Sequence, residues 1–310
     1  METKIQRITF IPDLVSLDIE ERFLKYFYKY KILYPNINNN YKYLFKIKRA
    51  DSLFIQKIIN HNSYKVHTAC FSEPQYFYFK KDLFLLSSLL IFDISNNTFY
   101  INENIIYTII FSNILVGEYY SSFTLINLII EIVLFINGYL YASGMSFKYE
   151  DKFYAFISPR NIGKSTFINN VITQKNYFYI SDNTIIINFR ENNIYPSAPS
   201  WSTKKTNSKT IFDYLIRNRE KIIIKKSKLT KLFMINKGNE NTSLNDFFYN
   251  SFLMFLSVSA IRDFIYLANY GDKLFLEINK TIRLLEKMKN KNKLDIKQIN
   301  NYNFQKIYEK

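Results

Sequence analysis

The first hundred residues contain short runs of β-branched and aromatic residues, separated by polar turns. The clearest runs are YKYLFKIK (41–48), QYFYFKKDLFLL (75–86), NTFYIN (97–102) and IIYTIIF (105–111). Such residues favour pleated strands, and the polar triplet Ser95, Asn96 and Asn97 is typical of a turn. The pattern therefore predicts a β-rich N-terminal region. One stretch, LDIEERFLKYFYK (17–29), is predicted to form an early helix instead.

The most apolar stretch is FTLINLIIEIVLFINGYL (123–140), which is about long enough to cross a bilayer. It contains Asn127, Glu131 and Asn137, and a carboxylate near the centre of a membrane is costly. A transmembrane helix is one interpretation of this stretch. We favour a helix buried in the core of a soluble protein, over residues 123–137, because of Glu131. Asn137 and Gly138 supply a helix stop, and LYASGMSF is predicted to begin a strand.

The next segment alternates between strand and helix patterns. KFYAFI (152–157) is typical of a short buried strand, SPRNIGKS of a loop, and TFINNVITQ of a helix of about three turns. YFYIS (177–181) is predicted to be a strand that ends at Asp182. A hairpin follows, and its turn is predicted at Glu191, Asn192 and Asn193.

The order of these patterns predicts an α/β fold, in which a mixed sheet is combined with helices. Residues 245–289 have a mainly helical pattern. We place a boundary near 118–122. It divides a β-rich region (1–118) from a second region (119–310) with a helical C-terminal part.

The loop SPRNIGKS resembles a phosphate-binding loop. The usual pattern is a glycine, four residues of any type, and then Gly-Lys-Ser or Gly-Lys-Thr. Gly163 and the two residues after it match, whereas Ser158 replaces the leading glycine. Backbone N–H groups of such a loop surround a phosphate at the N-terminus of a helix. The predicted nucleotide-binding residues are Ser158, Pro159, Arg160, Asn161, Ile162, Gly163, Lys164, Ser165 and Thr166.

Chemical roles follow from this motif. Lys164 is predicted to reach the β- and γ-phosphates of ATP or GTP, and Ser165 to ligate Mg²⁺. Asp182 follows the loop after a short interval and is placed to ligate Mg²⁺ or to accept a proton from a hydroxyl nucleophile. The predicted catalytic residues are therefore Lys164 and Asp182, and the metal ligands are Ser165 and Asp182. The alternatives are an ordinary turn in place of the loop and a turn aspartate before the hairpin.

Composition adds limits on partners and compartment. Lys and Arg number 42 against 26 Asp and Glu, which gives a net charge of +16. Such a field attracts nucleic acid, anionic membranes or acidic polypeptides, but a generally Lys-rich composition explains it equally well. No recognition motif for nucleic acid accompanies the charge, so we expect no nucleic-acid partner. One cysteine and two histidines exclude a disulfide framework and a Cys- or His-rich metal site. The N-terminus lacks the apolar core of a signal peptide, so we expect a cytoplasmic protein.

The segment from LYASGMSF to NNIYPSAP (140–199) resembles the nucleotide-binding core of the HPr kinase family, which has a PEP carboxykinase-like fold. It is most similar to the branch found beside ribosomal peptide biosynthesis, the lasso-peptide kinases. That family has a Leu-His-Ala-Ser strand, a second strand, the phosphate loop and its helix, and a strand that ends in Ser-Asp-Asp. An apolar helix precedes the first strand, as it does at 123–137 here. The resemblance implies a kinase that phosphorylates a Ser or Thr hydroxyl of a small protein or a precursor peptide. It also implies that residues 119–310 form the nucleotide-binding domain, and residues 1–118 are then a candidate for substrate recognition. The sequence leaves the oligomeric state open, and a homo-oligomer is one option.

Two residues depart from the family pattern. Tyr141 stands where the family has histidine, and Asn183 stands where it has a second aspartate. Asn183 can ligate Mg²⁺ but cannot accept a proton, so Asp182 would have to serve both functions. The departures leave three functions open. They are the kinase, another nucleotide-dependent group transfer in peptide biosynthesis, and a non-catalytic nucleotide-binding protein.

Overall fold

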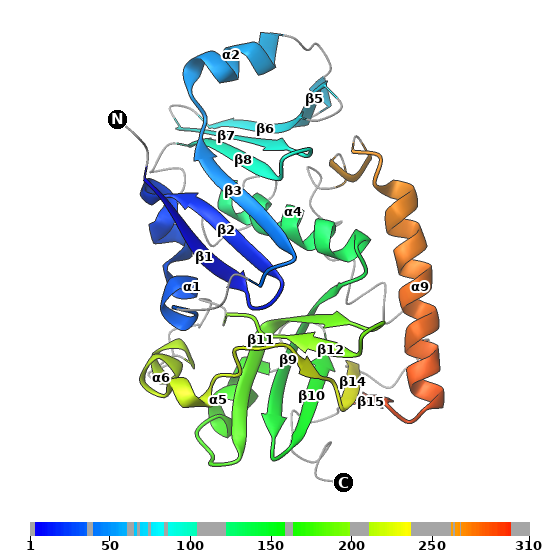
Figure 1. Cartoon of the computed structure of the whole chain (residues 1–310). Coiled ribbons are helices and arrows are strands. Elements are labelled where there is room, and N and C mark those ends of the chain that lie inside the picture. The colour runs from blue at the N-terminus through cyan, green and yellow to red at the C-terminus, as the bar shows by residue number, and fades with distance from the viewer. Residues whose placement is uncertain are drawn as a thin grey trace.

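A computed structural model shows the arrangement of strands and helices (Figure 1). The residues that it describes are 4–35, 40–60, 65–66, 69–73, 76–83, 86–103, 122–158, 164–198, 211–236, 262, 264–266 and 268–298. Over these ranges the chain combines two mixed sheets with helices. The predicted α/β class is therefore confirmed at this level.

The first sheet occupies the N-terminal part of the chain. Its eight described strands lie in the order β1-β2-β3-β8-β7-β6-β5-β4. The pairs β2/β3 and β3/β8 are parallel, and the other pairs are antiparallel. The strands are β1 (Ile5–Ile11), β2 (Val15–Glu20), β3 (Tyr43–Arg49), β4 (Lys65–Val66), β5 (Ala69–Glu73), β6 (Tyr76–Leu83), β7 (Leu86–Asp93) and β8 (Thr98–Glu103).

The second sheet carries the predicted nucleotide-binding motif. Within the described ranges it has seven strands in the order β13-β12-β11-β9-β10-β14-β15. Both β10 and β11 are antiparallel to the strand between them, β9, so they run in the same direction. The strands are β9 (Leu140–Tyr149), β10 (Lys152–Ile157), β11 (Tyr177–Asn188), β12 (Asn193–Tyr195), β13 (Ser227–Lys228), β14 (Lys231–Asn236) and β15 (Leu294–Gln298).

The helices cover the sheets and join them. They are a 3₁₀ helix (Glu21–Phe27), α1 (Tyr28–Leu33), α2 (Ser52–Asn60), α4 (Ser122–Ile136), α5 (Lys164–Val171), α6 (Ile211–Arg217), a second 3₁₀ helix (Arg219–Lys221) and α9 (Gly271–Asn290). In Figure 1, α4 lies between the two sheets and α9 runs along one side of the molecule. One hydrophobic cluster contains Phe45 and Phe99 of the first sheet, Ile129 of α4, and Ile185 and Leu232 of the second. The two sheets thus share a core.

The N-terminal strands confirm the predicted β-rich pattern. Strands β3, β6 and β8 coincide with three of the predicted runs, and the fourth run (105–111) lies outside the described residues. The early helix predicted over 17–29 is wrong at its start, because β2 continues to Glu20. Leu17 and Ile19 are fully buried and alternate with Ser16 and Asp18, which is the period-2 pattern of a strand. Helical structure begins at Glu21 and ends at Leu33.

The long apolar stretch forms the predicted buried helix. Nine apolar side chains of α4 are buried, from Phe123 to Phe135. Gly138 ends the helix with a φ of +86°, and its N–H donates to the carbonyl oxygen of Phe135 at 2.8 Å. Among the described residues, no helix is long and apolar enough to span a membrane.

The strand predicted to end at Asp182 is longer than expected. Strand β11 runs without interruption from Tyr177 to Asn188, because the isoleucines at 185–187 are fully buried and keep pairing with β9. The predicted hairpin between β11 and β12 is confirmed, but its turn occupies residues 189–192. Asn193 is the first residue of β12 and pairs with Asn188, so it is not part of the turn.

The division into two domains stays a prediction. Strands of the first sheet end at Glu103, and those of the second begin at Leu140. The expected boundary near 118–122 lies almost entirely outside the described residues. Of the predicted C-terminal helical region, the structure describes α9, which agrees with the pattern.

We expect Gly144→Ala to lower the free energy of unfolding by about 1–3 kcal/mol. A β-carbon at residue 144 would lie 2.4 Å from the carbonyl oxygen of Phe156 and 3.1 Å from Cδ1 of Ile185. The carbonyl oxygen belongs to β10, so it cannot move without disturbing the pairing of β9 and β10. Urea denaturation measures the effect. Gly271→Ala is the control, because no atom of the described residues lies within 4 Å of its β-carbon. Equal midpoints for the two variants would contradict the close packing at β9.

Candidate functional site

The predicted loop connects a strand and a helix, as its motif requires. Strand β10 ends at Ile157 and α5 begins at Lys164. This confirms the strand, whereas the helix begins earlier and is shorter than the predicted TFINNVITQ. Both described ends of the loop are buried, since Ser158 is 0% exposed and Lys164 is 5% exposed. The Lys164 amine donates to the carbonyl oxygen of Ser158 at 3.4 Å, so this lysine extends back over the loop.

Other predicted loop residues are only partly covered by the structure. Pro159, Arg160, Asn161, Ile162 and Gly163 lie outside the described residues. Ser165 is in α5, but its side chain lies outside the described part of the chain, and the Thr166 side chain is exposed. The assignment of these residues to a nucleotide therefore stays a prediction.

Asp182 lies at the level of the sheet where the loop begins. It pairs with Met145 of β9, which in turn pairs with Phe156 of β10. The next pair along these strands is Gly144 of β9 with Ile157, the last residue of β10. Adjacent strands are about 4.8 Å apart, so the backbone at Asp182 is about 10 Å from the end of β10, across β9. The acid is thus in the middle of β11, yet level with the end of the strand that leads into the loop.

The register also places Asp182 and the loop on one face of the sheet. Met145 and Phe156 share a hydrophobic cluster with Ile168 of α5, so this is the face that α5 covers. Paired residues on neighbouring strands point to the same face. Asp182 is 3% exposed and therefore slightly more buried than Lys164. The structure brings the two predicted catalytic residues to one face of the sheet, on either side of β9.

Hydroxyl side chains occupy the next row on the same face. Thr184 of β11 pairs with Ser143 of β9, and the N–H of Ser158 donates to the carbonyl oxygen of Ser143 at 3.0 Å. The hydroxyl oxygens of Ser143 and Ser158 are buried and have no hydrogen-bond partner among the described residues. A buried polar group without a partner costs about 1–3 kcal/mol. This row is therefore suited to a ligand that supplies hydrogen bonds, and phosphate oxygens can do so.

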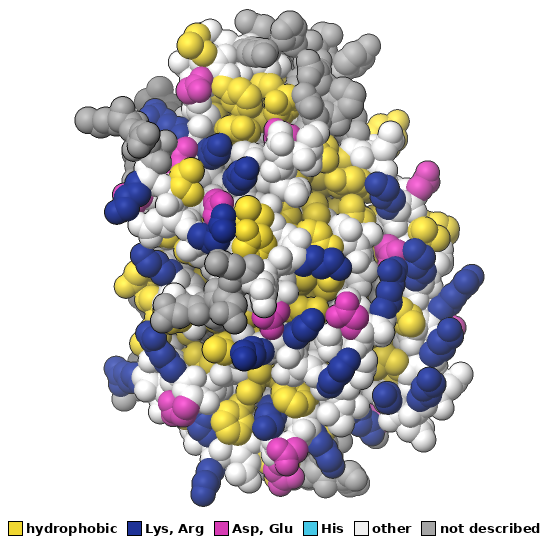
Figure 2. Space-filling model, viewed as in Figure 1, with side chains coloured by type: hydrophobic (Ala, Val, Ile, Leu, Met, Phe, Trp, Pro, Cys, Tyr) yellow, Lys and Arg dark blue, Asp and Glu magenta, His cyan; other side chains and the backbone are white. Residues whose placement is uncertain are grey.

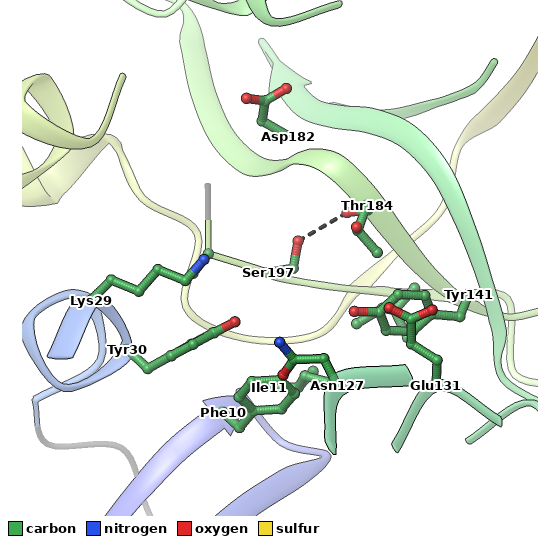
Figure 3. A pocket seen from close by; sticks show the side chains of 12 residues that line it. Phe10, Ile11, Lys29, Tyr30, Asn127, Glu131, Tyr141, Asp182, Thr184 and Ser197 are labelled. Atoms are coloured by element: carbon green, nitrogen blue, oxygen red, sulfur yellow. Dashed lines mark hydrogen bonds between the residues drawn. The ribbon is translucent and has the colours of Figure 1, made fainter. Parts of the chain in front are cut away.

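A polar cavity of about 190 Å³ lies next to Asp182 (Figure 3). Its walls come from β1, α1, α4, β9, β11 and the segment after β12. In Figure 3, the side chains of Lys29, Tyr30, Asn127 and Tyr141 point toward the same space. The apolar part of the lining is Phe10, Ile11, Ile186 and Ala198.

Helix α4 contributes a carboxylate to this cavity. Asn127 and Glu131 are four residues apart, so they lie on one side of the helix, and both line the cavity. Glu131 is hydrogen-bonded to the Tyr141 hydroxyl. Burial raises the pKa of Tyr141 well above its usual range, and the neighbouring Glu131 raises it further. Tyr141 therefore stays protonated and holds the carboxylate in place.

Helix α1 contributes an amine and a phenol from the N-terminal region. Lys29 and Tyr30 line the cavity, and the Lys29 amine lies 4.9 Å from the centre of the Tyr30 ring. Burial lowers the pKa of Lys29 to about 8, because a charged amine loses hydration there. Burial, followed by the Glu131 charge, raises the pKa of Tyr30. The cavity thus holds a lysine that changes charge near neutral pH beside tyrosines that do not.

Tyr179 of β11 fixes the backbone around Asp182 through hydrogen bonds of its hydroxyl group. Its hydroxyl donates to the carbonyl oxygen of Ser197 at 3.1 Å, and the backbone of Asp182 is a further hydrogen-bond partner. Burial raises the pKa of Tyr179, and the Asp182 charge raises it further. The Ser197 hydroxyl donates to the carbonyl oxygen of Thr184 at 2.9 Å. These bonds tie β11 to the segment after β12 at the level of the acid.

A site made wholly of protein ligands for a metal is absent from the described residues. No group of three or more His, Cys, Asp or Glu side chains there is arranged to hold a metal ion. Mg²⁺ in nucleotide sites commonly uses one or two protein ligands and completes its shell with phosphate oxygens and water. Asp182 is suited to be one of these few protein ligands of Mg²⁺.

The basic charge is distributed over the surface. Figure 2 shows Lys and Arg side chains over much of the visible face, and many lie along the edge that α9 occupies in Figure 1. The face also carries hydrophobic side chains between the charges. The expected absence of a nucleic-acid partner remains a prediction.

No known protein family matches the chain, and no curated protein matches it. The functional interpretation therefore depends on the site itself and on the resemblance of its motif.

Sequence reasoning did not identify four of the polar residues that line the cavity. Asn127 and Glu131 interrupt an apolar stretch, and their four-residue spacing is the available signal of a shared polar side. Lys29 and Tyr30 carry no such signal. They come from α1, far from Asp182 in sequence, and only the packing of the first sheet against the second brings them to the site.

We expect Lys29→Met to unfold at a higher temperature than the unmutated protein at pH 7. Lys29 has a pKa near 8 in the fold against 10.5 for an ordinary lysine, so its charge opposes folding below pH 8. This cost disappears as pH rises from 8 to 10.5, and the difference between the proteins should shrink over that window. The charged or titratable groups that face it are Tyr30, Glu131, Tyr141 and Asp182.

Thermal unfolding at pH 7 and pH 10 measures this difference. Lys25→Met is the matched control, because Lys25 is an exposed lysine of the preceding 3₁₀ helix. If the Lys29→Met protein were less stable than the unmutated protein at pH 7, this would contradict the prediction that the charged Lys29 amine opposes folding.

Proposed function

We propose that this protein is a phosphotransferase that uses ATP or GTP, with Mg²⁺, to phosphorylate a hydroxyl group. The proposed acceptor is a Ser or Thr of a peptide or a small protein. One observation carries the proposal. Lys164 at the start of α5 and Asp182 of β11 are both nearly fully buried on the face of the second sheet that α5 covers, and Asp182 also lines a polar cavity.

The side chains can divide the work of phosphoryl transfer. This reaction requires positioning and charge neutralisation more than covalent chemistry. Lys164 would neutralise charge on the phosphates, and the N-terminus of α5 would face them. Mg²⁺, when bound, neutralises further phosphate charge, and Ser165 with Asp182 would hold it. The hydroxyls of Ser143 and Ser158 provide buried hydrogen-bond partners at the start of the loop.

The resemblance to the HPr kinase family supports the same proposal. Strand, loop, helix and acid follow one another as in that family, and a buried apolar helix precedes them. A PEP carboxykinase-like arrangement of the second sheet, a cytoplasmic location and a role in peptide biosynthesis are parts of the proposal that come from this resemblance.

A non-catalytic nucleotide-binding protein is the second candidate. Tyr141 replaces the family's histidine, and its raised pKa prevents it from accepting a proton. Asn183 replaces the second acid. Product analysis separates the candidates, since a kinase forms ADP and a phosphorylated acceptor. Another group transfer would form AMP or a nucleotidyl adduct, and a binding protein would form no product.

We expect Lys164→Ala to weaken ATP binding on the order of 30-fold or more, because it removes a buried cation from the phosphates. Isothermal titration calorimetry with ATP and Mg²⁺ measures the affinity. Lys175→Ala is the matched control, since Lys175 lies exposed in the turn after α5. Unchanged affinity in Lys164→Ala would remove the phosphate loop from the proposal.

We expect Asp182→Asn to reduce phosphoryl transfer by a factor on the order of 10² or more, because it removes charge while preserving shape. Nucleotide binding through the loop should fall much less. Asn183→Asp, which restores the family's pair of acids, should keep or raise the activity. Transfer of labelled phosphate to an acceptor measures both, and thermal unfolding checks that each variant is folded. Full activity in Asp182→Asn would place the essential acid elsewhere.

A further inference from the structure

The site contains a second carboxylate that the phosphate-loop motif does not include. Glu131 lines the same cavity as Asp182 but comes from a different element, α4. Its neighbours on the helix are almost all apolar and buried. A carboxylate in such surroundings is costly unless it is hydrogen-bonded, and Tyr141 provides that bond. The helix thus holds a positioned charge inside a cavity.

The cavity presents groups that match a hydroxyl. A hydroxyl donates one hydrogen bond and accepts others, so it can bond to the Glu131 carboxylate and accept from an amide or an amine at the same time. Asn127 and Lys29 supply such donors, and both point into the cavity in Figure 3. The Oδ1 atom of Asn127 is buried and has no hydrogen-bond partner among the described residues. A ligand with a hydrogen-bond donor would relieve that cost.

The size of the cavity limits its occupant. A dry cavity of about 150 Å³ accommodates benzene, so about 190 Å³ accommodates a group of roughly six to ten heavy atoms. A nucleotide is much larger. The space therefore suits the acceptor of the proposed reaction and not the nucleotide.

We propose that this cavity is the acceptor site, that it binds an aliphatic hydroxyl on a group of roughly six to ten heavy atoms, and that Glu131 accepts the hydroxyl proton. The proposal rests on the proposed phosphotransferase function. In the reaction, the hydroxyl oxygen forms a bond to the γ-phosphorus, and the bond from that phosphorus to the β–γ bridging oxygen breaks. ADP or GDP leaves, and the hydroxyl proton goes to the Glu131 carboxylate. Tyr141 acts as a positioning residue for Glu131.

This assignment divides two tasks between two acids. Asp182 lies level with the loop and can serve the metal and the phosphates. Asn183 cannot accept a proton, so the motif alone leaves Asp182 to serve as the base as well. Glu131 supplies the missing proton acceptor from a different element. Because α1 completes the cavity with Lys29 and Tyr30, the N-terminal region takes part in binding the acceptor.

The test uses the full chain and three probes. Glycerol and L-serine represent free small alcohols, and N-acetyl-L-serine methylamide represents a serine within a peptide. Saturation-transfer NMR without nucleotide measures binding of each probe, and mass spectrometry after incubation with ATP and Mg²⁺ measures its phosphorylation. We expect at least one probe to bind and to be phosphorylated, and the probe that succeeds identifies a free or a peptide-borne hydroxyl.

Glu131→Gln should reduce transfer to that probe by a factor on the order of 10² or more and remove the acid limb of the pH–rate profile. Its ATP affinity should be unchanged, because Glu131 belongs to α4 and not to the phosphate-loop motif. Glu286→Gln is the control, since Glu286 is an exposed carboxylate on α9. If Glu131→Gln fails to fold, Tyr141→Phe tests the same carboxylate. It should shift the acid limb to higher pH, because Glu131 loses a hydrogen bond that favours its charged form.

The outcomes separate this proposal from the function on which it rests. ATP binding with no binding or phosphorylation of any probe would overturn the acceptor site and leave the phosphotransferase standing. Full transfer in Glu131→Gln, or an unshifted acid limb in Tyr141→Phe, would overturn the role of Glu131. A protein that binds no ATP would overturn the proposed function itself. Probe binding that Glu131→Gln abolishes would still assign the cavity to a hydroxyl ligand.

Discussion

The burial of α4 is the constraint on which both sheets and the cavity depend. Its nine buried apolar side chains each contribute about 1.5–3 kcal/mol when they leave water. The helix packs against β7 and β8 of the first sheet, β9 of the second, and α9. The side of α4 that carries Asn127 and Glu131 is only partly exposed, so these polar side chains need hydrogen-bond partners within the protein. The same packing that joins the sheets therefore creates a polar cavity between them.

The second constraint is the register of β9. This strand separates the loop strand from the acid strand, and its pairing on both sides sets which residues are level with one another. A shift of one residue would turn Ser143 and Tyr141 to the opposite face and separate them from Thr184 and Asp182. Gly144 allows the Phe156 carbonyl to approach closely, so the register and the glycine depend on each other. The relative positions of the loop and Asp182 therefore depend on backbone pairing in β9, a strand that contains none of the predicted site residues.

Local patterns predicted much of the second sheet, because its elements are set by neighbouring residues. The strand KFYAFI has the same bounds in the structure, and the helix stop at Gly138 occurs where its positive φ is needed. The errors arose where two patterns competed. Residues 17–29 combine an alternating start with a helical end, and β11 continues past a turn-forming Asp182 because three buried isoleucines follow. The cavity is a tertiary feature, and sequence spacing carries no information about the approach of Lys29 to Glu131.

Tyr141, which stands where the HPr kinase family has histidine, has a distinct role in the proposed enzyme. A histidine at this position would gain and lose a proton near neutral pH. The buried tyrosine keeps its proton, since both burial and Glu131 raise its pKa. It can therefore serve only as a permanent donor, and the group it donates to is a carboxylate that the phosphate-loop motif does not include. Asn183 and Tyr141 stand where the HPr kinase family has an acid and a histidine, and in the proposed enzyme these two differences belong together. There, Glu131 of α4 accepts the proton in place of a residue on the sheet, and Tyr141 holds Glu131 in position.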